Sequence, residues 1–476
     1  MLIVIKPGIK DTEMIDPKSN CKPSLKKHRN ALFAIVLFGF LLRAIVPILA
    51  FSVTKDINIF HSYDTSKYVG AALGLVKTGQ FTTNGIPETV RTPGYPLLIV
   101  PGLWVGIVEP VTVALQILLS CFTIYLIYKI GLKLFEAPGP ALLAAGLYAV
   151  EPLSIIYTSL LMSETLFATT LMCFVYYFVK YLKNDSWKTL IISATLSAIC
   201  VYVRPVSYFL AALITLFLFG MVLIRRIWTR KTALQTLSFF LISYALLVPW
   251  QLRNAYYADS WSFSGVSSDD LYFFTASTVL AQINKVPYEE QREEMAYASA
   301  ELYLKPHPGG GEWTENEVRR WRSSEALRII TAYPVAYLKM VSLGVAWTVA
   351  GPGVGSWLEV FKMNRDPSGK GKFATEDDKL YYLRVSRLSY WGSIFLGLTL
   401  GVYWITALVG GYKMFRLDPW SLAFLVLIAT YFVLIPAMLA IGYSRFRHPI
   451  LPIVCILGGH GLWAIFDRLL SRKNPT

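Results

Sequence analysis

Charge is scarce in this chain of 476 residues, because only 16% of them are Asp, Glu, Lys or Arg. Hydrophobic residues make up 55%, and the mean hydropathy is +0.48. A soluble globular domain carries about 25% charged residues, so this composition excludes an ordinary soluble protein. The large excess of hydrophobic over charged residues indicates a polytopic membrane protein.

Cysteine is also rare. Of the five cysteines, Cys21 lies in a basic N-terminal tail and the other four lie in apolar segments. Their odd number and irregular spacing favour neither a disulfide framework nor a zinc site. The sequence also lacks a phosphate-binding loop, a dinucleotide fingerprint, a zinc-protease motif and a nucleophile elbow in a convincing context. Chemistry on soluble nucleotide sugars is therefore not supported.

Long apolar runs are the dominant feature that is present. A helix needs roughly 20 apolar residues to cross a bilayer. Two shorter apolar segments, 96–109 and 335–352, raise the number of spans by two if both cross. We therefore expect an all-α bundle of about 10–12 transmembrane helices. The ten clearer spans are predicted at 31–54, 110–133, 139–157, 164–182, 188–204, 207–224, 233–250, 388–410, 420–441 and 449–467.

The formal net charge of +15 reflects basic residues at the ends of apolar spans. Such a distribution is typical of membrane orientation, and we expect no nucleic-acid partner. Basic pairs such as Arg225 with Arg226 fall on the same side as the N-terminus, which should be cytoplasmic. We expect a multi-pass protein of a bacterial or archaeal plasma (inner) membrane, with its active site on the extracytoplasmic face.

Four regions follow from this topology. Residues 1–30 form a basic cytoplasmic tail, and 31–250 form an N-terminal transmembrane module whose first extracytoplasmic loop is 55–95. Residues 251–335 are expected to form short extracytoplasmic helices and no separate sheet domain. Residues 336–476 form a C-terminal transmembrane module.

The polar run after the first span contains Asp64, with Tyr68 four positions later and hence on the same side of a helix. Polar groups beside a bilayer are costly unless they serve a purpose. The Asp64 carboxylate could accept a proton from an incoming hydroxyl or amine. It could equally cap the start of a helix, since Asp commonly accepts hydrogen bonds from free backbone amides there.

Arg91 precedes a stiff run in which Pro93 and Pro96 flank Gly94 and Tyr95. The prolines restrict the backbone and Gly94 permits a turn. A guanidinium group held in this way suits a lipid phosphate, because its planar fork makes paired hydrogen bonds. The alternative is an arginine that extends its charge out of the membrane boundary.

Further charged residues lie at predicted outer ends of spans. Glu164 could be a second acid that orients the acceptor, or a first-turn acid that complements the helix dipole. Arg204, Arg253, Arg445 and Arg447 are unusual because positive residues are disfavoured on the outer side. They could bind a phosphate headgroup or contact anionic lipid.

Arg43 falls near the middle of the first span. A charge at that depth is expected to face the bundle interior and to have a polar partner. We expect its role to be structural.

In this arrangement the chain resembles the GT-C glycosyltransferases that use polyprenyl-phosphate sugars, the group containing protein O-mannosyltransferases and aminoarabinose transferases. A proline pair is common in the family where this chain has Pro93-Gly94-Tyr95-Pro96, and an acidic neighbour is common where Thr65 follows Asp64. The matching features are Asp64 with Tyr68, the run Arg91–Pro96, Glu164, Pro249-Trp250 with Arg253-Asn254, and Arg445-Phe446-Arg447 with Pro449 and Pro452.

The resemblance implies a GT-C-like bundle that performs an inverting hexosyl or pentosyl transfer from a lipid-phosphate donor. Asp64 would be the general base and Glu164 the second catalytic acid. The acceptor is a lipid, a glycan or a protein, and membrane lipids are further partners. The candidate ligands of the donor phosphate are Arg91, Arg253, Arg445 and Arg447, and the candidate substrate-binding residues are Tyr68, Tyr95 and Arg204.

A lone acid is a poor cage for a divalent ion, so no metal ligands are assigned and no obligatory cofactor is expected, although a divalent metal is not excluded. The alternative function is a multi-span transporter or flippase of a lipid-linked or anionic substrate. Carriers often contain repeated halves, whereas here the charged motifs gather at one face. A noncatalytic lipid-binding scaffold is a third possibility.

Overall fold

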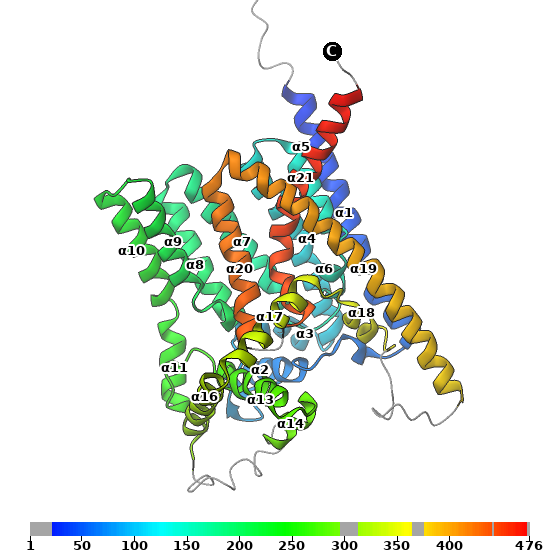
Figure 1. The fold of residues 1–476 in the computed structure, drawn as a ribbon, viewed down its shortest axis with the longest axis vertical. Coiled ribbons are helices and arrows are strands. Elements are labelled where there is room, and N and C mark those ends of the chain that lie inside the picture. The colour runs from blue at the N-terminus through cyan, green and yellow to red at the C-terminus, as the bar shows by residue number, and fades with distance from the viewer. Residues whose placement is uncertain (1–20, 296–312, 364–375, 440–441, 474–476) are drawn as a thin grey trace, which may run out of the picture.

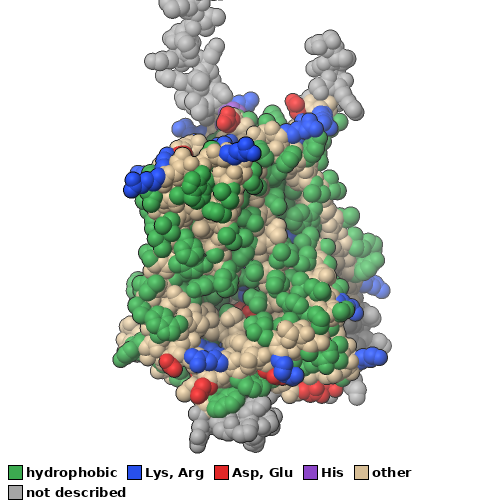
Figure 2. Space-filling view, turned by 60° about the vertical axis from the view of Figure 1, so that its left-hand side comes forward, with side chains coloured by type: hydrophobic (Ala, Val, Ile, Leu, Met, Phe, Trp, Pro, Cys, Tyr) green, Lys and Arg blue, Asp and Glu red, His purple; other side chains and the backbone are tan. Residues whose placement is uncertain are grey.

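The computed structural model describes residues 21–295, 313–363, 376–439 and 442–473. These residues form an elongated helical bundle in which the start of α1 and the end of α21 lie together at the upper end of Figure 1. Apolar side chains cover the middle of the molecule, while Lys and Arg gather toward its two ends (Figure 2). This banding fits a bilayer around the middle. The predicted all-α membrane architecture is confirmed.

Eight stretches of the described chain are helical, long and apolar enough to span a membrane. They correspond to eight of the ten predicted spans. The elements concerned are α1 (Cys21–Thr54), α4 (Val108–Phe135), α7 (Glu164–Asn184), η2 (Pro205–Ser207) with α9 (Leu210–Ile224), α10 (Arg230–Ala245) with α11 (Val248–Ala258), α19 (Glu376–Leu417), α20 (Pro419–Leu439), and η4 (Ser444–Ile450) with α21 (Leu451–Lys473).

The other two predicted spans, 139–157 and 188–204, are not among these eight stretches. The run 139–157 is divided into α5 (Pro138–Ala149) and α6 (Pro152–Ile156), and α8 (Trp187–Val203) has 17 residues. With a rise of 1.5 Å per residue, α5 is about 18 Å long, too short to span a bilayer alone. The break falls at Val150 and Glu151, directly before Pro152, within a run that is otherwise mostly apolar.

The two ambiguous segments also differ from simple spans. The segment 96–109 contains most of α3 (Gly94–Val105), an apolar helix of 12 residues. The segment 335–352 falls in α17 (Pro334–Ala350), which is bent by 101° relative to α16 (Glu315–Ala332). If this bent pair is one broken span, the described chain has up to nine spans.

Arg43 explains how the break after α5 is tolerated. Its side chain is fully buried and donates hydrogen bonds to the carbonyls of Tyr148 (3.0 Å) and Ala149 (2.8 Å). It also donates to the hydroxyls of Ser120 (2.7 Å) and Ser154 (2.8 Å). The last carbonyls of a helix have no partner within the helix, and leaving them unpaired in an apolar region is costly. Arg43 therefore has the interior, structural position that was predicted.

Small residues allow α21 to pack closely against its neighbours. A Cβ atom on Gly410 would lie 2.8 Å from the backbone nitrogen of Gly461, and one on Gly459 would lie 2.6 Å from the Cα of Ala144. Close backbone approach of this kind is common between helices in membranes. It joins α19 and α5 to the C-terminal helix.

The lower end of Figure 1 consists of short elements, as predicted for the region 251–335 within the described residues. A small antiparallel pair, β1 with β2, lies in the first loop and aligns Thr82 with Pro87. The elements outside the long helices are η1 (Ile57–Phe60), α2 (Thr65–Thr78), β1 (Thr82–Thr83), β2 (Ile86–Pro87), α12 (Val266–Asp269), η3 (Asp270–Ala276), α13 (Ser277–Asn284), α14 (Tyr288–Glu294) and α18 (Val354–Val360).

Replacing Arg43 should destabilise the bundle. In Arg43→Met the carbonyl of Ala149 loses its Arg43 donor, and the carbonyl of Tyr148 keeps only the longer hydrogen bonds from the Glu151 amide (3.3 Å) and the Ser154 hydroxyl (3.4 Å). Each unsatisfied buried group costs about 1–3 kcal/mol. We expect the free energy of unfolding to fall by about 3 kcal/mol, measured as a lower Tm of the purified protein in detergent. Arg29→Met, at an exposed position of α1, is the control and should leave Tm nearly unchanged. Equal Tm values for the two variants would contradict this role.

Candidate active site

Five charged side chains from distant parts of the chain meet near the lower end of the bundle. Asp64 immediately precedes α2, Arg91 lies before α3, and Glu164 begins α7. Arg204 follows the last residue of α8, and Arg445 lies in η4. We call these five residues the charged cluster. All five were candidate site residues in the sequence analysis.

Asp64 is held by two arginines. Arg91 Nη2 donates to its Oδ1 at 2.6 Å, and Arg445 Nη2 donates to its Oδ2 at 3.2 Å. Burial opposes ionisation of Asp64, but the charges of these arginines outweigh it and hold the pKa of the carboxyl below its usual range. Although Asp64 occupies the position before α2, its side chain makes no capping hydrogen bond. The capping interpretation is therefore wrong, and the carboxylate faces the site.

Glu164 is the second carboxylate of the cluster and is fully buried. Arg445 Nε donates to its Oε1 at 2.5 Å, and Arg204 Nη1 lies 2.9 Å from the same oxygen. Its other oxygen, Oε2, has no hydrogen-bond partner among the described residues. Glu164 is thus the more deeply buried of the two acids, and Arg445 connects them.

The charges of the cluster do not balance. Three arginines contribute three positive charges and the two carboxylates contribute two negative charges, so one positive charge is in excess. The side chains of Asp64, Arg91 and Arg445 are each less than a quarter exposed. A partly buried site with excess positive charge favours an anion, and guanidinium groups suit phosphate.

The backbone around Arg91 is fixed by Glu88. One oxygen of the Glu88 carboxylate accepts hydrogen bonds from the backbone amides of Val90 (2.8 Å) and Arg91 (2.9 Å). The other accepts the hydroxyl of Thr83 at 3.0 Å. The Arg91 guanidinium lies over the ring of Tyr68, 5.6 Å from its centroid. These contacts orient Arg91 toward Asp64.

Gly94 has a different role from the turn that was predicted. It is the first residue of α3 and lies against the end of α8. A Cβ atom on Gly94 would lie 2.7 Å from the carbonyl oxygen of Tyr202 and 2.8 Å from the Cα of Val203. Only glycine permits this approach, which brings Arg91 and Arg204 to the same site.

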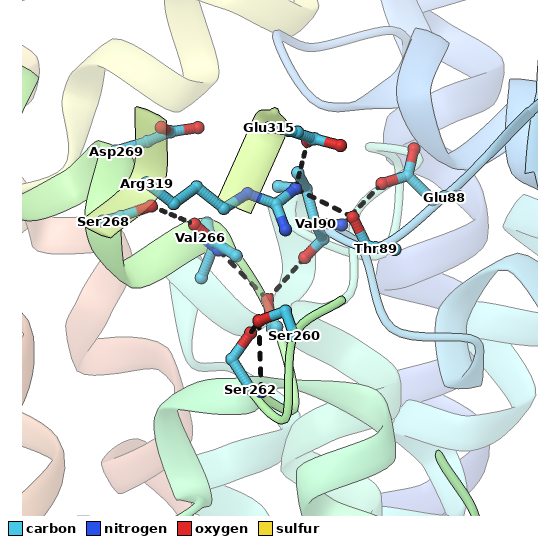
Figure 3. A network of polar contacts seen from close by, with 12 residues as sticks. Glu88, Thr89, Val90, Ser260, Ser262, Val266, Ser268, Asp269, Glu315 and Arg319 are labelled. Carbon is cyan, nitrogen blue, oxygen red and sulfur yellow. Dashed lines mark hydrogen bonds and ion pairs between the residues drawn. The ribbon is translucent and has the colours of Figure 1, made fainter. Parts of the chain in front are cut away.

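Residues 259–276, which follow α11 and which we call the outer segment, dock on the residues that immediately precede Arg91 (Figure 3). The Gly265 amide donates to the carbonyl of Thr89 at 3.0 Å, and the Ser264 hydroxyl donates to the carbonyl of Val90 at 2.5 Å. Arg319 of α16 donates to the hydroxyl of Thr89 at 2.8 Å. These hydrogen bonds therefore fix the outer segment against the two residues that precede Arg91.

Arg253, a predicted phosphate ligand, is not part of the charged cluster. Its two terminal nitrogens donate to the backbone carbonyls of Glu88 (2.5 Å) and Phe81 (2.6 Å). Its guanidinium also lies over the ring of Trp250, at 4.9 Å from the centroid. Arg253 therefore supports the backbone of the first loop.

Arg447 is likewise separate from the cluster. It is buried, and its Nη1 donates to the carbonyls of Thr348 and Gly351, both at 2.8 Å. These carbonyls lie at the end of α17, where a helix lacks internal partners. The Arg447 side chain thus provides hydrogen-bond donors for the carbonyls at the end of α17.

Tyr68 and Tyr95, the two tyrosines predicted to bind substrate, pack against each other, and Tyr68 contacts Arg91. Their rings meet edge to face with centroids 4.8 Å apart. The Tyr68 hydroxyl donates to Ser163 at 3.4 Å, and the fully buried Tyr95 donates to Gln116 Oε1 at 2.9 Å. Tyr68 adjoins the cluster, whereas Tyr95 belongs to the core beneath it.

Sequence reasoning missed Asp270, the first residue of the π-helix η3. Burial raises the pKa of Asp270 to about 7, with Asp269 and Asp64 adding to the effect of burial against the charge of Arg91. The acidic pair Asp269-Asp270 was the only signal in the sequence. Across the described ranges, no group of three or more His, Cys, Asp or Glu side chains is placed to hold a metal ion.

The fold of the chain is similar to the GT-C fold of solved oligosaccharyltransferases. Residues 91–250 match the family model described as dolichyl-phosphate-mannose-protein mannosyltransferase. This match contains Arg91, Glu164 and Arg204. The GT-C resemblance predicted from the motifs is confirmed.

The solved structures that it matches include archaeal oligosaccharyltransferases. AglB from Archaeoglobus fulgidus, in complex with an inhibitory peptide and a dolichol-phosphate, aligns with a TM-score of 0.54 and 13% identity over 95% of this chain and 52% of its own. The oligosaccharyltransferase of the same organism tethered with an acceptor peptide gives a TM-score of 0.53 and 15% identity, over 93% and 50%. The present chain thus spans about half the length of these proteins.

A weaker match is ArnT from Cupriavidus metallidurans bound to undecaprenyl phosphate. Its TM-score is 0.39 at 12% identity, over 90% of this chain and 78% of its own, which is too low to support an argument. No curated protein matches the chain in sequence.

The contact at Gly94 gives a direct test of how the site is assembled. In Gly94→Ala the new methyl group meets the backbone of α8, which cannot move aside as a side chain can. We expect the free energy of unfolding to fall by about 1–3 kcal/mol, measured by Tm. Gly220→Ala in α9 is the matched control, since nothing lies within 4 Å of its added Cβ. A Gly94→Ala protein as stable as the control would contradict the close approach.

Proposed function

We propose that the protein is an integral membrane glycosyltransferase that uses a polyprenyl-phosphate sugar as donor. The observation that carries this proposal is the one positive charge in excess in the charged cluster. The phosphodiester of such a donor carries one negative charge and would balance it. The match to a mannosyltransferase family model and the GT-C fold support the same class of reaction.

Arg91 and Arg445 are the proposed ligands of the donor phosphate. Both already hold an anionic group, the carboxylate of Asp64. A phosphate between them would replace part of this pairing. As the bond between the sugar and the phosphate breaks, negative charge grows on the leaving phosphate, and fixed guanidinium groups stabilise it.

Asp64 is the proposed general base. In the absence of donor, its arginine partners keep the pKa of Asp64 low and its carboxyl ionised. When the phosphate draws the arginines away, the basicity of Asp64 increases. Asp64 then takes the proton of an acceptor hydroxyl or amine while the acceptor atom bonds to the anomeric carbon and the phosphate leaves with its bonding electrons. A single displacement of this kind inverts the anomeric configuration.

Glu164 acts in this proposal through its neighbours. It is more deeply buried than Asp64 and pairs with Arg445 and Arg204, so it positions the phosphate ligands and does not face the acceptor. Arg204 adds positive charge at the floor of the site. The tyrosine ring of Tyr68 supports Arg91.

We further propose that the reaction takes place on the extracytoplasmic face of a plasma membrane. Basic residues at the ends of α9 and α19, which lie at the upper end of Figure 1, include Arg225, Arg226 and Arg416 and favour a cytoplasmic location for that end. The charged cluster lies toward the opposite end. The transferred sugar is a hexose or a pentose, and the acceptor is a lipid, a glycan or a protein that reaches the site close to the membrane.

Phosphate binding can be tested apart from catalysis. For undecaprenyl phosphate in detergent, Arg91→Gln should weaken binding at least about tenfold, which corresponds to about 1.4 kcal/mol. Asp64→Asn should bind at least as tightly as the wild type, because the competing carboxylate is gone. Arg328→Gln, in an exposed pair with Glu325, is the control. Unchanged affinity in Arg91→Gln would remove this residue from the donor site.

Transfer itself can be followed with a panel of polyprenyl-phosphate sugars and acceptor mixtures. We expect Asp64→Asn to lower the rate of polyprenyl phosphate release about 10²- to 10⁴-fold, as expected for loss of a general base. Asp185→Asn, at an exposed turn bonded to Lys231, should retain the wild-type rate. Equal release by Asp64→Asn and the wild type would contradict the role of Asp64. Solute movement in sealed vesicles without sugar transfer would favour the transporter alternative.

A further inference from the structure

Asp270 lies in the segment that docks beside Arg91, close enough for its charge to interact with those of Arg91, Asp64 and Arg445. Two residues shortly before it, Ser264 and Gly265, bond to the carbonyls of Val90 and Thr89. These carbonyls belong to the two residues that precede Arg91. The docking shown in Figure 3 therefore fixes the start of η3 relative to Arg91 and its partner Asp64.

The local helix geometry also fixes the position of Asp270. The preceding residue, Asp269, accepts a hydrogen bond from Arg322 of α16 at 2.6 Å. Ser268 bonds back to the carbonyl of Gly265 at 2.8 Å. The helix then changes from α to π at Asp270. Single π turns are wider than an α-helix and occur frequently at functional sites.

The carboxylate of Asp270 is partly exposed and makes no hydrogen bond or ion pair with any residue that the structure describes. It differs in this respect from Asp64, Glu164 and Asp269, which are all paired. An unpaired carboxylate beside an ion-paired site is free to exchange a proton.

Several charges act on Asp270. Arg91 and Asp64 act from the first loop, Arg445 acts from η4, and Asp269 acts from the preceding residue. Helices α12, α13, α16 and α20 pack against η3. Neither α13 nor α20 contains a charged residue. The charged residues of α16 include Arg319, Arg322 and Glu325, and Arg322 pairs with Asp269.

We propose that Asp270 is a proton relay that receives from Asp64 the proton of the acceptor and passes it to bulk water. This inference rests on the proposed function. The acceptor proton moves first to Asp64 as the new glycosidic bond forms, and then to Asp270, directly or through one water molecule. Asp64 is thereby returned to its ionised form, able to pair with Arg91 and Arg445 when the phosphate leaves.

The environments of the two acids favour this direction of transfer. Despite burial, the two arginines lower the pKa of Asp64, whereas burial raises the pKa of Asp270 to about 7. Once the phosphate has left and the two arginines pair with Asp64 again, a proton is therefore more stable on Asp270 than on Asp64. Because Asp270 is partly exposed and has a pKa near neutrality, it can release the proton to water at neutral pH.

The relay predicts a specific pH dependence. Asp270 must be ionised to accept a proton, so the turnover rate of the wild type should rise with pH through a pKa of about 7. Asp270→Asn should lower kcat about tenfold or more and remove this rise, with little change in KM for the donor. Asp270→Glu should restore the rise.

Asp269→Asn is the matched neighbour control. It should keep the rise and shift it to lower pH, because the negative charge of Asp269 helps to raise the pKa of Asp270. Neither Asp269 nor Asp270 belongs to the charged cluster that binds phosphate. Undecaprenyl phosphate should therefore bind to Asp270→Asn and to the wild type with the same affinity.

A second measurement needs no substrate. Infrared difference spectra of the full-length protein between acidic and alkaline pH should show a carboxyl C=O band that titrates with a midpoint of about 7. The band should be absent in Asp270→Asn. In Asp64→Asn its midpoint should fall, because loss of one negative charge strengthens the effect of Arg91 on Asp270.

The outcomes separate the two proposals. If wild-type and Asp270→Asn proteins show the same pH–rate profile, the relay is overturned while the proposed glycosyltransferase function stands. A band that persists in Asp270→Asn would also overturn it. If the wild type releases no polyprenyl phosphate from any donor, the proposed function fails, and the relay fails with it.

Discussion

The side chain of Arg445 joins three parts of the chain that are otherwise far apart in sequence. It contacts Asp64 from the first loop and Glu164 from the start of α7, and it projects from η4. Because Glu164 is completely buried, removing this guanidinium would leave its charge with Arg204 as its one remaining ion-pair partner among the described residues, and weakening a buried ion pair is costly in a protein interior. The arginine is thus a structural link as well as a proposed ligand of the donor phosphate. The same contacts of Arg445 that hold the first loop, α7 and η4 together also orient it for its proposed role in binding phosphate.

Much of the site could be predicted because charge is rare in the membrane-facing sequence. Asp64, Arg91, Glu164, Arg204 and Arg445 all lie at ends of apolar segments, and predicted sidedness placed these ends together. Burial of unpaired charge is costly, so residues of opposite charge at the same end tend to meet. The structure brings these five together.

Other parts of the structure could not be predicted from the sequence, because they depend on hydrogen bonds to the backbone or on breaks between helices. Arg253 and Arg447 resemble phosphate ligands in sequence, yet both donate to carbonyls exposed by local folding. The division of 139–157 was missed although Glu151 and Pro152 mark it, because the residues on both sides are mostly apolar and together have the length of a span. Asp270 was missed because its position is set by contacts of Thr89 and Val90 with a segment about 175 residues later.

Arg43 has a consequence for the order in which the protein is made. Its carbonyl partners, Tyr148 and Ala149, follow it by 105 and 106 residues. During synthesis the first helix therefore enters the membrane long before those partners exist. A charged group at that depth is expensive in lipid. The nascent α1 must accordingly remain beside a polar or proteinaceous surface until α5 arrives, so membrane integration of the first helix is completed only after the fifth has been inserted.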